Sequence, residues 1–273
     1  MLDRMLKAVK YLLLIIGALF VFVPFLWMLS TSLKTGAESI SIPPTLLPAN
    51  AQWGNYVQAW GVAPWLLYFR NTLIIAVVGT TLLVLISILS AYAFTIFSFP
   101  GKKIIFMLYL ATMMIPSELL IIQNYVTVTK LGWIDSFRGI IIPTLANGFY
   151  IFMLREYFMQ VPSSLFRAAK VDGCGTWGYL WKVMVPMSKN AVSTIAILSF
   201  ISYWNSFVWP LMVTNTDAHR VLSIGLMQFN YSVSSEVHLQ MAGTTIVLLP
   251  MVIFYIIFRK KIVSGVAKGG IKG

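Results

Sequence analysis

The chain has 273 residues, of which 59% are hydrophobic and only 10% charged, and its mean hydropathy is +0.83. A soluble domain carries about 25% charged residues, so this composition excludes an ordinary soluble enzyme, a disordered chain and a nucleic-acid-binding domain. One cysteine, two histidines and eight acidic residues exclude a disulfide framework and leave little material for a metal site. We therefore predict a polytopic membrane protein without a catalytic or metal site of its own.

Six apolar stretches are long enough to cross a bilayer, which takes roughly 20 residues in a helix. A backbone in lipid must satisfy its own hydrogen bonds, so such runs favour helices and an all-α membrane protein. The fourth stretch is the weakest, because it is short and contains Pro143 and Gly148. We expect it to continue past Arg155 towards Val161. The predicted transmembrane helices lie near residues 11–33, 71–97, 104–122, 139–154, 190–212 and 239–258.

The basic residues indicate the orientation of these helices. Fifteen Lys and Arg residues fall in the amino terminus, the 98–103 loop, the 155–189 loop and the 259–273 tail, whereas five fall in the remaining loops. The side of the membrane with the excess is normally the cytoplasmic side, so both termini are predicted to be cytoplasmic. The net charge of +12 then reflects topology and attraction to anionic lipid, with no need for a nucleic-acid partner.

Ionisable residues are scarce within the predicted helices, and Glu118, just after Pro116, is the clearest one. It marks a solute path or is an interfacial carboxylate that faces water. Amides, hydroxyls and aromatic rings are more numerous. These groups can bind a neutral sugar or polyol, although they also serve as contacts between helices and as an aromatic belt. The candidate translocation path comprises Glu118, Gln123, Asn124, Asn147, Tyr203, Trp204, Asn205 and Trp209.

The sequence contains no G-x-x-x-x-G-K-[ST] phosphate loop, so ATP-driven transport would need an ATPase on another chain. A stand-alone secondary carrier of a small polar solute is the alternative, but it would need an inverted repeat and ion-coupling groups, and neither is clear. An intramembrane enzyme is a third possibility. Its candidate residues, His219 and His238, are expected to be solvated residues of an outer loop.

The 155–189 loop has the pattern of a short helix, a turn and a second helix. Pro162 and the serines after it are a start signal, and Asp172-Gly173 is a stop signal. Leu165, Phe166 and Ala169 would share one face of the first helix. The second helical run, Thr176–Val185, is expected to end before Pro186. An amphipathic helix of this length docks into a groove on a partner or lies on lipid headgroups.

This loop resembles the EAA loop of ABC-importer permeases. That pattern is E-A-A, three residues, G, nine residues and I-x-L-P. Ala168, Ala169 and Gly173 match it, followed after nine residues by Val183–Pro186. The resemblance is strongest to the carbohydrate-uptake class-1, maltose-type inner-membrane permeases with a MetI-like domain. It covers essentially the whole chain and includes Asn55-Tyr56, the segment 99–102, Tyr203-Trp204-Asn205 and the glycine-rich tail.

The resemblance implies a single permease domain over residues 1–273 with the type I importer fold, in a bacterial or archaeal cytoplasmic membrane. Its implied partners are a second homologous permease, two cytoplasmic ATPase subunits that carry ATP and Mg, and an extracytoplasmic solute-binding protein, which would meet the outer loops 34–70 and 213–240. The implied cargo is a carbohydrate, most readily an oligosaccharide; polyols and sugar phosphates stay open.

The resemblance also assigns roles to residues. Coupling to the ATPase within the 162–186 segment would involve Phe166, Arg167, Ala168, Ala169, Asp172, Gly173 and Pro186. A further contact of the tail with the ATPase would involve Gly269, Gly270, Ile271, Lys272 and Gly273. One position departs from the family, because Arg167 stands where a Glu is usual. Either the ATPase carries a compensating acidic group or this contact is dispensable.

Overall fold

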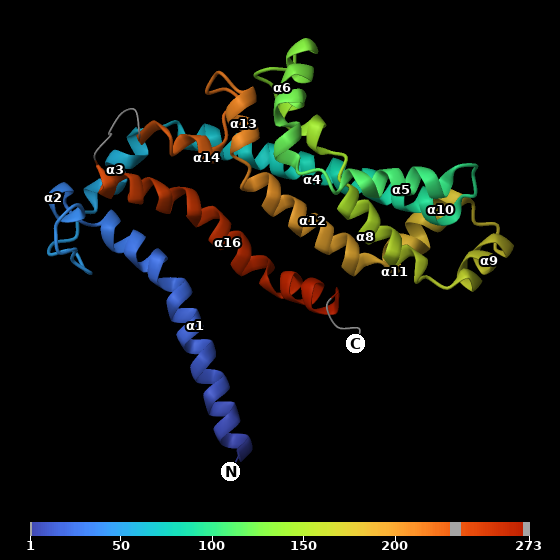
Figure 1. The fold of residues 1–273 in the computed structure, drawn as a ribbon, viewed down its shortest axis with the longest axis horizontal. Coiled ribbons are helices and arrows are strands. Elements are labelled where there is room, and N and C mark those ends of the chain that lie inside the picture. Colours follow the sequence, from blue (N-terminus) through green and yellow to red (C-terminus); the bar gives the residue numbers. More distant parts are fainter. Residues whose placement is uncertain (1, 230–235, 270–273) are drawn as a thin grey trace. The chain divides into compact units, whose positions relative to one another are not determined.

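A computed structural model describes residues 2–229 and 236–269 of the chain. These residues form helices, turns and loops, with no strand among them (Figure 1). They fall into two compact units, Met1–Trp65 with Leu222–Phe254 and Leu66–Val221 with Tyr255–Gly273. We describe each unit by itself, and the single permease domain stays a prediction.

The first unit contains a long helix, α1, whose residues from Val9 to Leu26 are all exposed. This helix includes Pro24 yet is continuous, and only 6% of its most apolar window is buried. An exposed apolar helix surface of this kind is stable in contact with the hydrocarbon of a lipid bilayer. The helices of this unit are α1 (Leu2–Ser32), α2 (Gly36–Ser39), α3 (Gly54–Gly61), α14 (Leu222–Gly225) and the first part of α16 (Val237–Gly269).

Side-chain hydrogen bonds hold α3 against the end of α1. The buried Asn55 amide donates to the carbonyls of Ser32 and Lys34, at 2.9 and 2.8 Å. The indole of Trp65 donates to the Ala59 carbonyl at 2.8 Å. His238 is not the solvated loop residue predicted from the sequence. It is the second residue of α16, only 8% exposed, and its ring lies close above Gly36.

The second unit is a bundle with short helices at both ends. In Figure 1, α6 and α13 lie at one end of the long helices α4, α5, α8 and α12, while α9 and α10 lie at the other end. The elements are α4 (Trp65–Ile96), α5 (Lys102–Thr112), η1 (Ser117–Leu120), α6 (Ile121–Lys130), α7 (Phe137–Ile141), η2 (Ile142–Thr144), α8 (Gly148–Met159), α9 (Ser163–Val171), α10 (Thr176–Tyr179), η3 (Leu180–Met184), α11 (Val185–Met187), α12 (Lys189–Trp204) and α13 (Val208–Val213).

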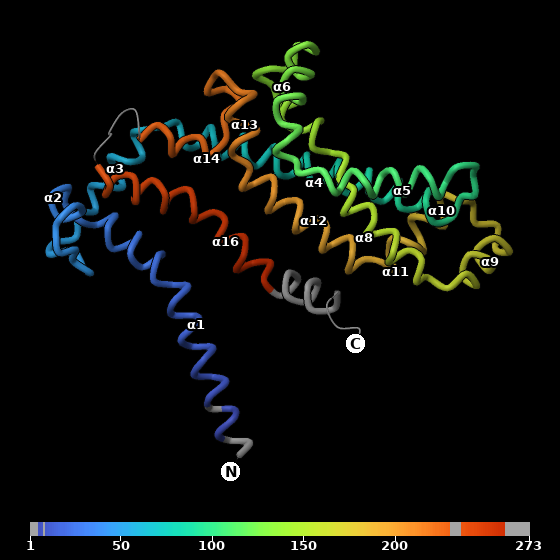
Figure 2. Tube along the Cα trace, in the orientation of Figure 1, coloured from blue at the N-terminus to red at the C-terminus, as the bar shows by residue number. Residues whose placement is uncertain are grey.

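The 104–122 stretch, predicted as a transmembrane helix, is divided into two parts. α5 ends at Thr112, and the chain turns by 92° before η1 and α6 continue (Figure 2). Pro116 explains the break, because it lacks an amide donor and disfavours helical geometry at Ile115. Both halves are apolar, so the hydropathy of the sequence does not show the turn.

Two further predicted spans are also interrupted. The 139–154 stretch is bent by 50° between η2 and α8, with Pro143 in η2. The 190–212 stretch is divided between α12, which ends at Trp204, and α13, which begins at Val208. As expected, α8 continues past Arg155, and it ends at Met159.

Three helices are individually long and apolar enough to cross a membrane, namely Met5–Ser32, Trp65–Ile96 and Val237–Arg259. Three bent helix pairs would raise the number of spans to six, if each pair is one span. Within the described residues, the chain is therefore an all-helical membrane protein with three to six candidate spans.

Candidate translocation cavity and coupling helix

A cavity of about 660 Å³ lies in the second unit, at the breaks of the interrupted helices. It takes residues from the 112–124 turn, from the 143–150 turn and from the end of α12. Among the residues that line it, Glu118 is the one charged side chain. Polar groups that accompany it are Thr112, Ser117, Asn124, Thr144, Asn147, Tyr150, Ser199, Ser202, Tyr203 and Ser206.

The broken helices explain why this cavity is polar. A helix end leaves peptide groups without a partner in the helix, and at membrane depth these are tolerated where they line a water-filled cavity. Asn147 serves one such end, because its side-chain oxygen accepts from the amides of Phe149 and Tyr150 at 3.1 and 3.4 Å. Glu118 is exposed, and Ser117 donates to its carboxylate at 3.2 Å.

Tyr203 forms the packed wall of the cavity. It is 7% exposed, and its hydroxyl shares a 3.1 Å hydrogen bond with the Thr144 hydroxyl. Its ring lies directly against Gly79 of α4, where a Cβ atom would come within 2.8 Å of the ring. Only a glycine at position 79 allows α4 and this ring to approach so closely.

Four of the eight candidate path residues do not line this cavity. Gln123 and Asn205 are exposed elsewhere. Trp204 packs on Phe69 and Phe200, with ring centroids 5.7 and 5.8 Å away. The Trp209 indole donates to two carbonyls of α7 at 3.2 Å each, so both tryptophans hold helices together. The candidates that do line it are Glu118, Asn124, Asn147 and Tyr203.

Four polar residues that were not predicted also line the cavity, namely Thr112, Ser117, Thr144 and Ser199. Three of these residues could have been recognised in the sequence by their positions at the helix breaks. Thr144 follows Pro143, Ser117 follows Pro116, and Thr112 is the last residue before the same break.

The predicted helix–turn–helix in the 155–189 loop is present. α9 begins at Ser163, directly after Pro162, and ends in a left-handed Gly173 with φ of 73°. The amides of Gly173 and Cys174 donate to the carbonyls of Lys170 and Ala169 at 3.2 and 2.8 Å. This is the Schellman arrangement of a helix end, for which glycine is the preferred residue.

The second helical run differs from its prediction. It passes through a π-helical segment, η3, and continues to Met187, so Pro186 is inside α11 and does not end the run. Pro186 lies in the first turn of α11, where a missing amide donor is tolerated.

α9 packs on the rest of the unit through the Phe166 ring, and most of its other residues are exposed. Phe166 packs edge-on against Tyr179, with ring centroids 5.0 Å apart, and no residue of α9 is buried. Val171 at its end is 88% exposed, and Trp177 beyond the turn is 66% exposed. The predicted coupling residues Arg167, Ala168, Asp172, Gly173 and Pro186 are exposed, and Ala169 is half-buried. α16 ends at Gly269, while Gly270, Ile271, Lys272 and Gly273 lie outside the described residues.

The opposite end of the second unit carries a polar loop that is fixed by Asp135. This carboxylate accepts from the amides of Asn215 and Thr216 at 3.1 and 3.2 Å and from the Thr216 hydroxyl at 2.6 Å. Partial burial alone would raise the pKa of Asp135, but these bonds and nearby His219 outweigh it, and the pKa lies below its ordinary value. The 213–220 loop is thereby tied to the 131–136 turn.

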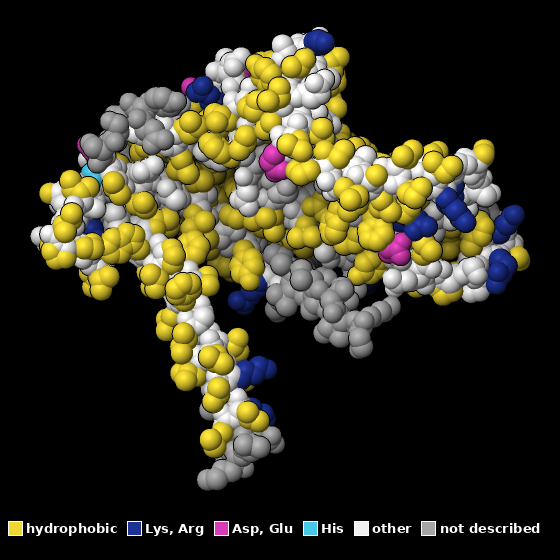
Figure 3. Space-filling view, viewed as in Figure 1, with side chains coloured by type: hydrophobic (Ala, Val, Ile, Leu, Met, Phe, Trp, Pro, Cys, Tyr) yellow, Lys and Arg dark blue, Asp and Glu magenta, His cyan; other side chains and the backbone are white. Residues whose placement is uncertain are grey.

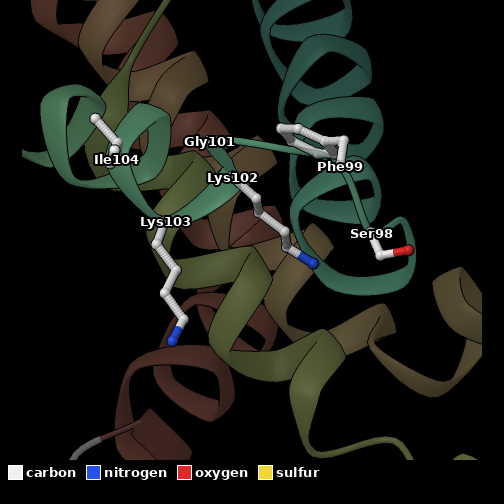
Figure 4. A pocket seen from close by; sticks show the side chains of 6 residues that line it. All are labelled: Ser98, Phe99, Gly101, Lys102, Lys103 and Ile104. Atoms are coloured by element: carbon white, nitrogen blue, oxygen red, sulfur yellow. The ribbon is translucent and has the colours of Figure 1, made fainter.

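A second cavity, of about 480 Å³, lies at the turn between α4 and α5 (Figure 4). Lys102 reaches back from this turn and donates to the Phe97 carbonyl at 2.7 Å, which satisfies a backbone acceptor just beyond the end of α4. Gly101 allows the turn, with φ of 78°. This cavity is lined by Ser98, Phe99, Gly101, Lys102, Lys103 and Ile104 and shares no residue with the cavity at the helix breaks.

An apolar helical bundle, a polar cavity at broken helices and an exposed short helix are the features expected of a membrane transport protein. Residues 83–268 match the family described as binding-protein-dependent transport system inner membrane component. The chain belongs to this family. It is accordingly a multi-pass permease of bacterial inner membranes and a transport subunit with no enzymatic role, and the ATPase of such a system is a separate subunit. This assignment decides against the stand-alone carrier and the intramembrane enzyme.

Individual relatives cover nearly the whole chain. The diacetylchitobiose uptake system permease protein NgcG of Streptomyces coelicolor is 31% identical over 98% of this chain and 89% of its own length. The arabinooligosaccharides transport system permease protein AraQ of Bacillus subtilis is 30% identical over 92% of this chain and 90% of its own length. The sn-glycerol-3-phosphate permease UgpE of Yersinia pestis is 29% identical over 93% of this chain and 94% of its own.

The fold is also similar to a solved structure. A chain of a bacterial ABC transporter involved in import of the acidic polysaccharide alginate superposes with a TM-score of 0.80, at 25% sequence identity, over 94% of this chain and 96% of that one.

Proposed function

We propose that this permease is one half of the pore of an ATP-driven importer for a carbohydrate, with an oligosaccharide as the cargo. In this proposal it has six spans, both termini in the cytoplasm and the type I importer fold. A second homologous permease completes the pore, two ATPase subunits bind ATP and Mg, and a solute-binding protein delivers the cargo from outside.

The exposed α9 is the observation that carries this proposal. A nine-residue helix with a Schellman end, packed through the ring of Phe166, presents the family's loop spacing, and none of its residues is buried by the residues that the structure describes. Helices of this kind dock into grooves of partner proteins. The ATPase of the system is the partner with which the EAA pattern is associated, so α9 would carry its motion into the bundle through Tyr179 and η3.

The cavity at the helix breaks supports a neutral polar cargo. Its lining offers hydroxyls, amides and two tyrosine rings, and such groups exchange hydrogen bonds with sugar hydroxyls and pack on sugar rings. Two relatives carry names of oligosaccharide systems, for diacetylchitobiose and for arabinooligosaccharides. We therefore assign Glu118, Asn124, Asn147 and Tyr203 to the translocation path.

The coupling role is tested by a pair of glycine variants in one turn. Gly173→Val places a β-branched residue at φ of 73°, which costs about 1–3 kcal/mol of strain and should distort the end of α9. Gly175→Val is the matched control, because Gly175 has φ of −68° and no atom near its Cβ position. We expect Gly173→Val to insert normally but to lose at least about tenfold in binding-protein-stimulated ATPase activity.

Equal ATPase stimulation and equal uptake in the two variants would contradict the coupling assignment. Equal membrane levels, measured by immunoblot, separate this outcome from a failure to insert.

Arg167 should face an acidic group of the ATPase, since it is exposed on α9 where the family usually has a Glu. The change Arg167→Glu would then set two like charges against each other and weaken docking. We expect a lower stimulated ATPase rate for Arg167→Glu and a rate near normal for Arg167→Lys. Unchanged activity of Arg167→Glu would show that the contact is dispensable.

A further inference from the structure

The outer segment of the first unit is unusual in carrying no charge. Residues 39–69, between Glu38 and Arg70, include no Asp, Glu, Lys, Arg or His. At the ordinary frequency of about 25%, a water-exposed stretch of this length would carry roughly eight charged residues. Much of the segment, from Ser41 to Trp53, is not helical, so the absence of charge does not come from a membrane-spanning helix.

Polar contacts clamp this segment onto the end of α1. The ammonium of Lys34, a residue that is 1% exposed, donates to the Thr45 carbonyl and lies 4.4 Å from the Trp27 ring centroid. The Ser30 hydroxyl donates to the Leu46 carbonyl, and the Ala49 amide donates to Glu38 at 2.9 Å. The Thr45 and Leu46 carbonyls and the Ala49 amide are thus paired with side chains of α1, α2 and the turn between them.

The side chains of the same loop are turned outward. Ile42, Leu46 and Leu47 are 95%, 76% and 77% exposed, although each would gain about 1.5–3 kcal/mol from full burial. Figure 3 shows hydrophobic side chains over α2 and the loop that follows it. Because hydrogen bonds fix the conformation of the loop, these side chains cannot fold back against the unit, and they stay exposed to the surroundings.

α3 continues the apolar surface of this loop. Trp53, Val57 and Trp60 are exposed, and their spacing of four and three residues places them on one side of the helix. Asn55 and Ala59, on its other side, are buried against the unit. A short helix with a protein-facing side and an apolar outer side that carries tryptophan is typical of a helix in the membrane interface.

We propose that residues 40–60 lie in the outer leaflet as an interfacial lipid anchor, with Ile42, Leu46, Leu47, Trp53, Val57 and Trp60 in contact with lipid. Two observations favour lipid as the occupant. The surface is continuous with α1, whose apolar window is 6% buried and whose last residue is Ser32. It also offers no charge with which a protein partner could form an ion pair.

A docking site for the solute-binding protein is the competing occupant of this surface. The 213–221 loop is better suited to that role, because it presents Asp217 and Arg220 at the surface, joined at 3.1 Å. The whole 34–70 loop was expected to contact the binding protein, and we now exclude residues 40–60 from that contact. Residues 40–60 belong to the membrane.

The anchor is testable by spin labelling, because Cys174 is the one cysteine of the chain. Cys174 is first replaced by serine. Three single-cysteine variants are then made and labelled with a nitroxide: Leu46→Cys, Leu47→Cys and the control Ala218→Cys. Ala218 is an exposed residue of the 213–221 loop. The full transporter is reconstituted in vesicles of phosphatidylethanolamine and phosphatidylglycerol. Collision rates of the label are measured with oxygen, which enters lipid, and with a water-soluble nickel chelate.

We expect oxygen collisions at positions 46 and 47 to exceed nickel collisions several-fold, at a depth of roughly 5–10 Å below the headgroups. At position 218 nickel collisions should dominate. Two results would overturn the proposal. One is nickel access at 46 and 47 equal to that at 218. The other is protection of 46 and 47 that arises only when the binding protein is added. The two labelled positions guard against one variant failing to insert.

Discussion

Single residues determine how closely the helices of the second unit approach. Gly79 has no side chain, so the Tyr203 ring can pack directly against the backbone of α4. In this position the Tyr203 hydroxyl forms a hydrogen bond with the Thr144 hydroxyl beside the cavity. Gly148 works in a similar way, since a Cβ there would come within 2.6 Å of the Met113 side chain. The shape of the cavity therefore depends on the absence of side-chain atoms at two positions.

The first residue-scale prediction concerns Gly79→Ala. The added methyl group would overlap the Tyr203 ring, and overpacking of this kind costs about 1–3 kcal/mol. We expect a lower melting temperature in detergent and slower uptake. Tyr203→Ala in the same chain should restore the melting temperature in part, because it removes the overlapping ring. Gly17→Ala is the control, since no atom lies within 4 Å of its Cβ position. Equal melting temperatures for Gly79→Ala and Gly17→Ala would contradict the close approach.

The second residue-scale prediction concerns the pH dependence of the 213–220 loop. The folded pKa of Asp135 is below its ordinary value, so its stabilising contribution is complete above the unfolded pKa, near 4. It is lost as pH falls through the folded pKa. Asp135→Asn keeps a residue that tolerates φ of 55° but removes the charge.

We expect Asp135→Asn to reduce stability by about 1 kcal/mol at pH 7, with a difference from the unaltered protein that shrinks below pH 4. Thermal unfolding across this pH range measures the effect. A stability difference between Asp135→Asn and the unaltered protein that grows as the pH falls would contradict this prediction.

Whole elements show which parts of the fold follow from local sequence signals. α9 and its turn were predictable, because Pro162 and Gly173 act within a few residues of themselves. The breaks at 113–116 and 205–207 were not, because hydropathy averages over segments that are apolar on both sides. Pro24 lies inside a continuous α1, whereas Pro116 interrupts a span. The presence of a proline in an apolar stretch therefore does not by itself predict a break.

The cavity was predictable only in part for the same reason. Glu118, Asn124, Asn147 and Tyr203 attracted notice as polar groups in apolar stretches, and the structure gathers them at one place. Trp204 and Trp209 attracted notice on the same grounds, yet both contact neighbouring helices. Composition alone does not tell which side of a helix faces a cavity.

The break at Pro116 should be required for transport. Pro116→Ala restores an amide donor and allows α5 to continue, which would move Glu118 and Ser117 away from the cavity. We expect uptake to fall severalfold while the protein still inserts, with Pro24→Ala in α1 close to normal. Normal uptake by Pro116→Ala would show that the cavity does not depend on this turn.

On the whole molecule, three exposed surfaces differ in the surroundings that suit them. α9 is an exposed helix at one end of the second unit, which we propose docks on the ATPase, and the Asp135-fixed loop is a polar surface at its other end. α1 and the uncharged segment after it in the first unit present exposed apolar side chains, which we propose contact lipid. Exposed surfaces of these kinds agree with membership of a family of transport subunits.

The measurement that tests the account most directly is identification of the proteins that co-purify with a tagged chain from its native membrane in mild detergent. We expect a second permease and a cytoplasmic ATPase, with the ATPase lost in the Gly173→Val variant and retained in Gly175→Val. A chain that purifies alone and still moves solute across vesicles without ATP would contradict it.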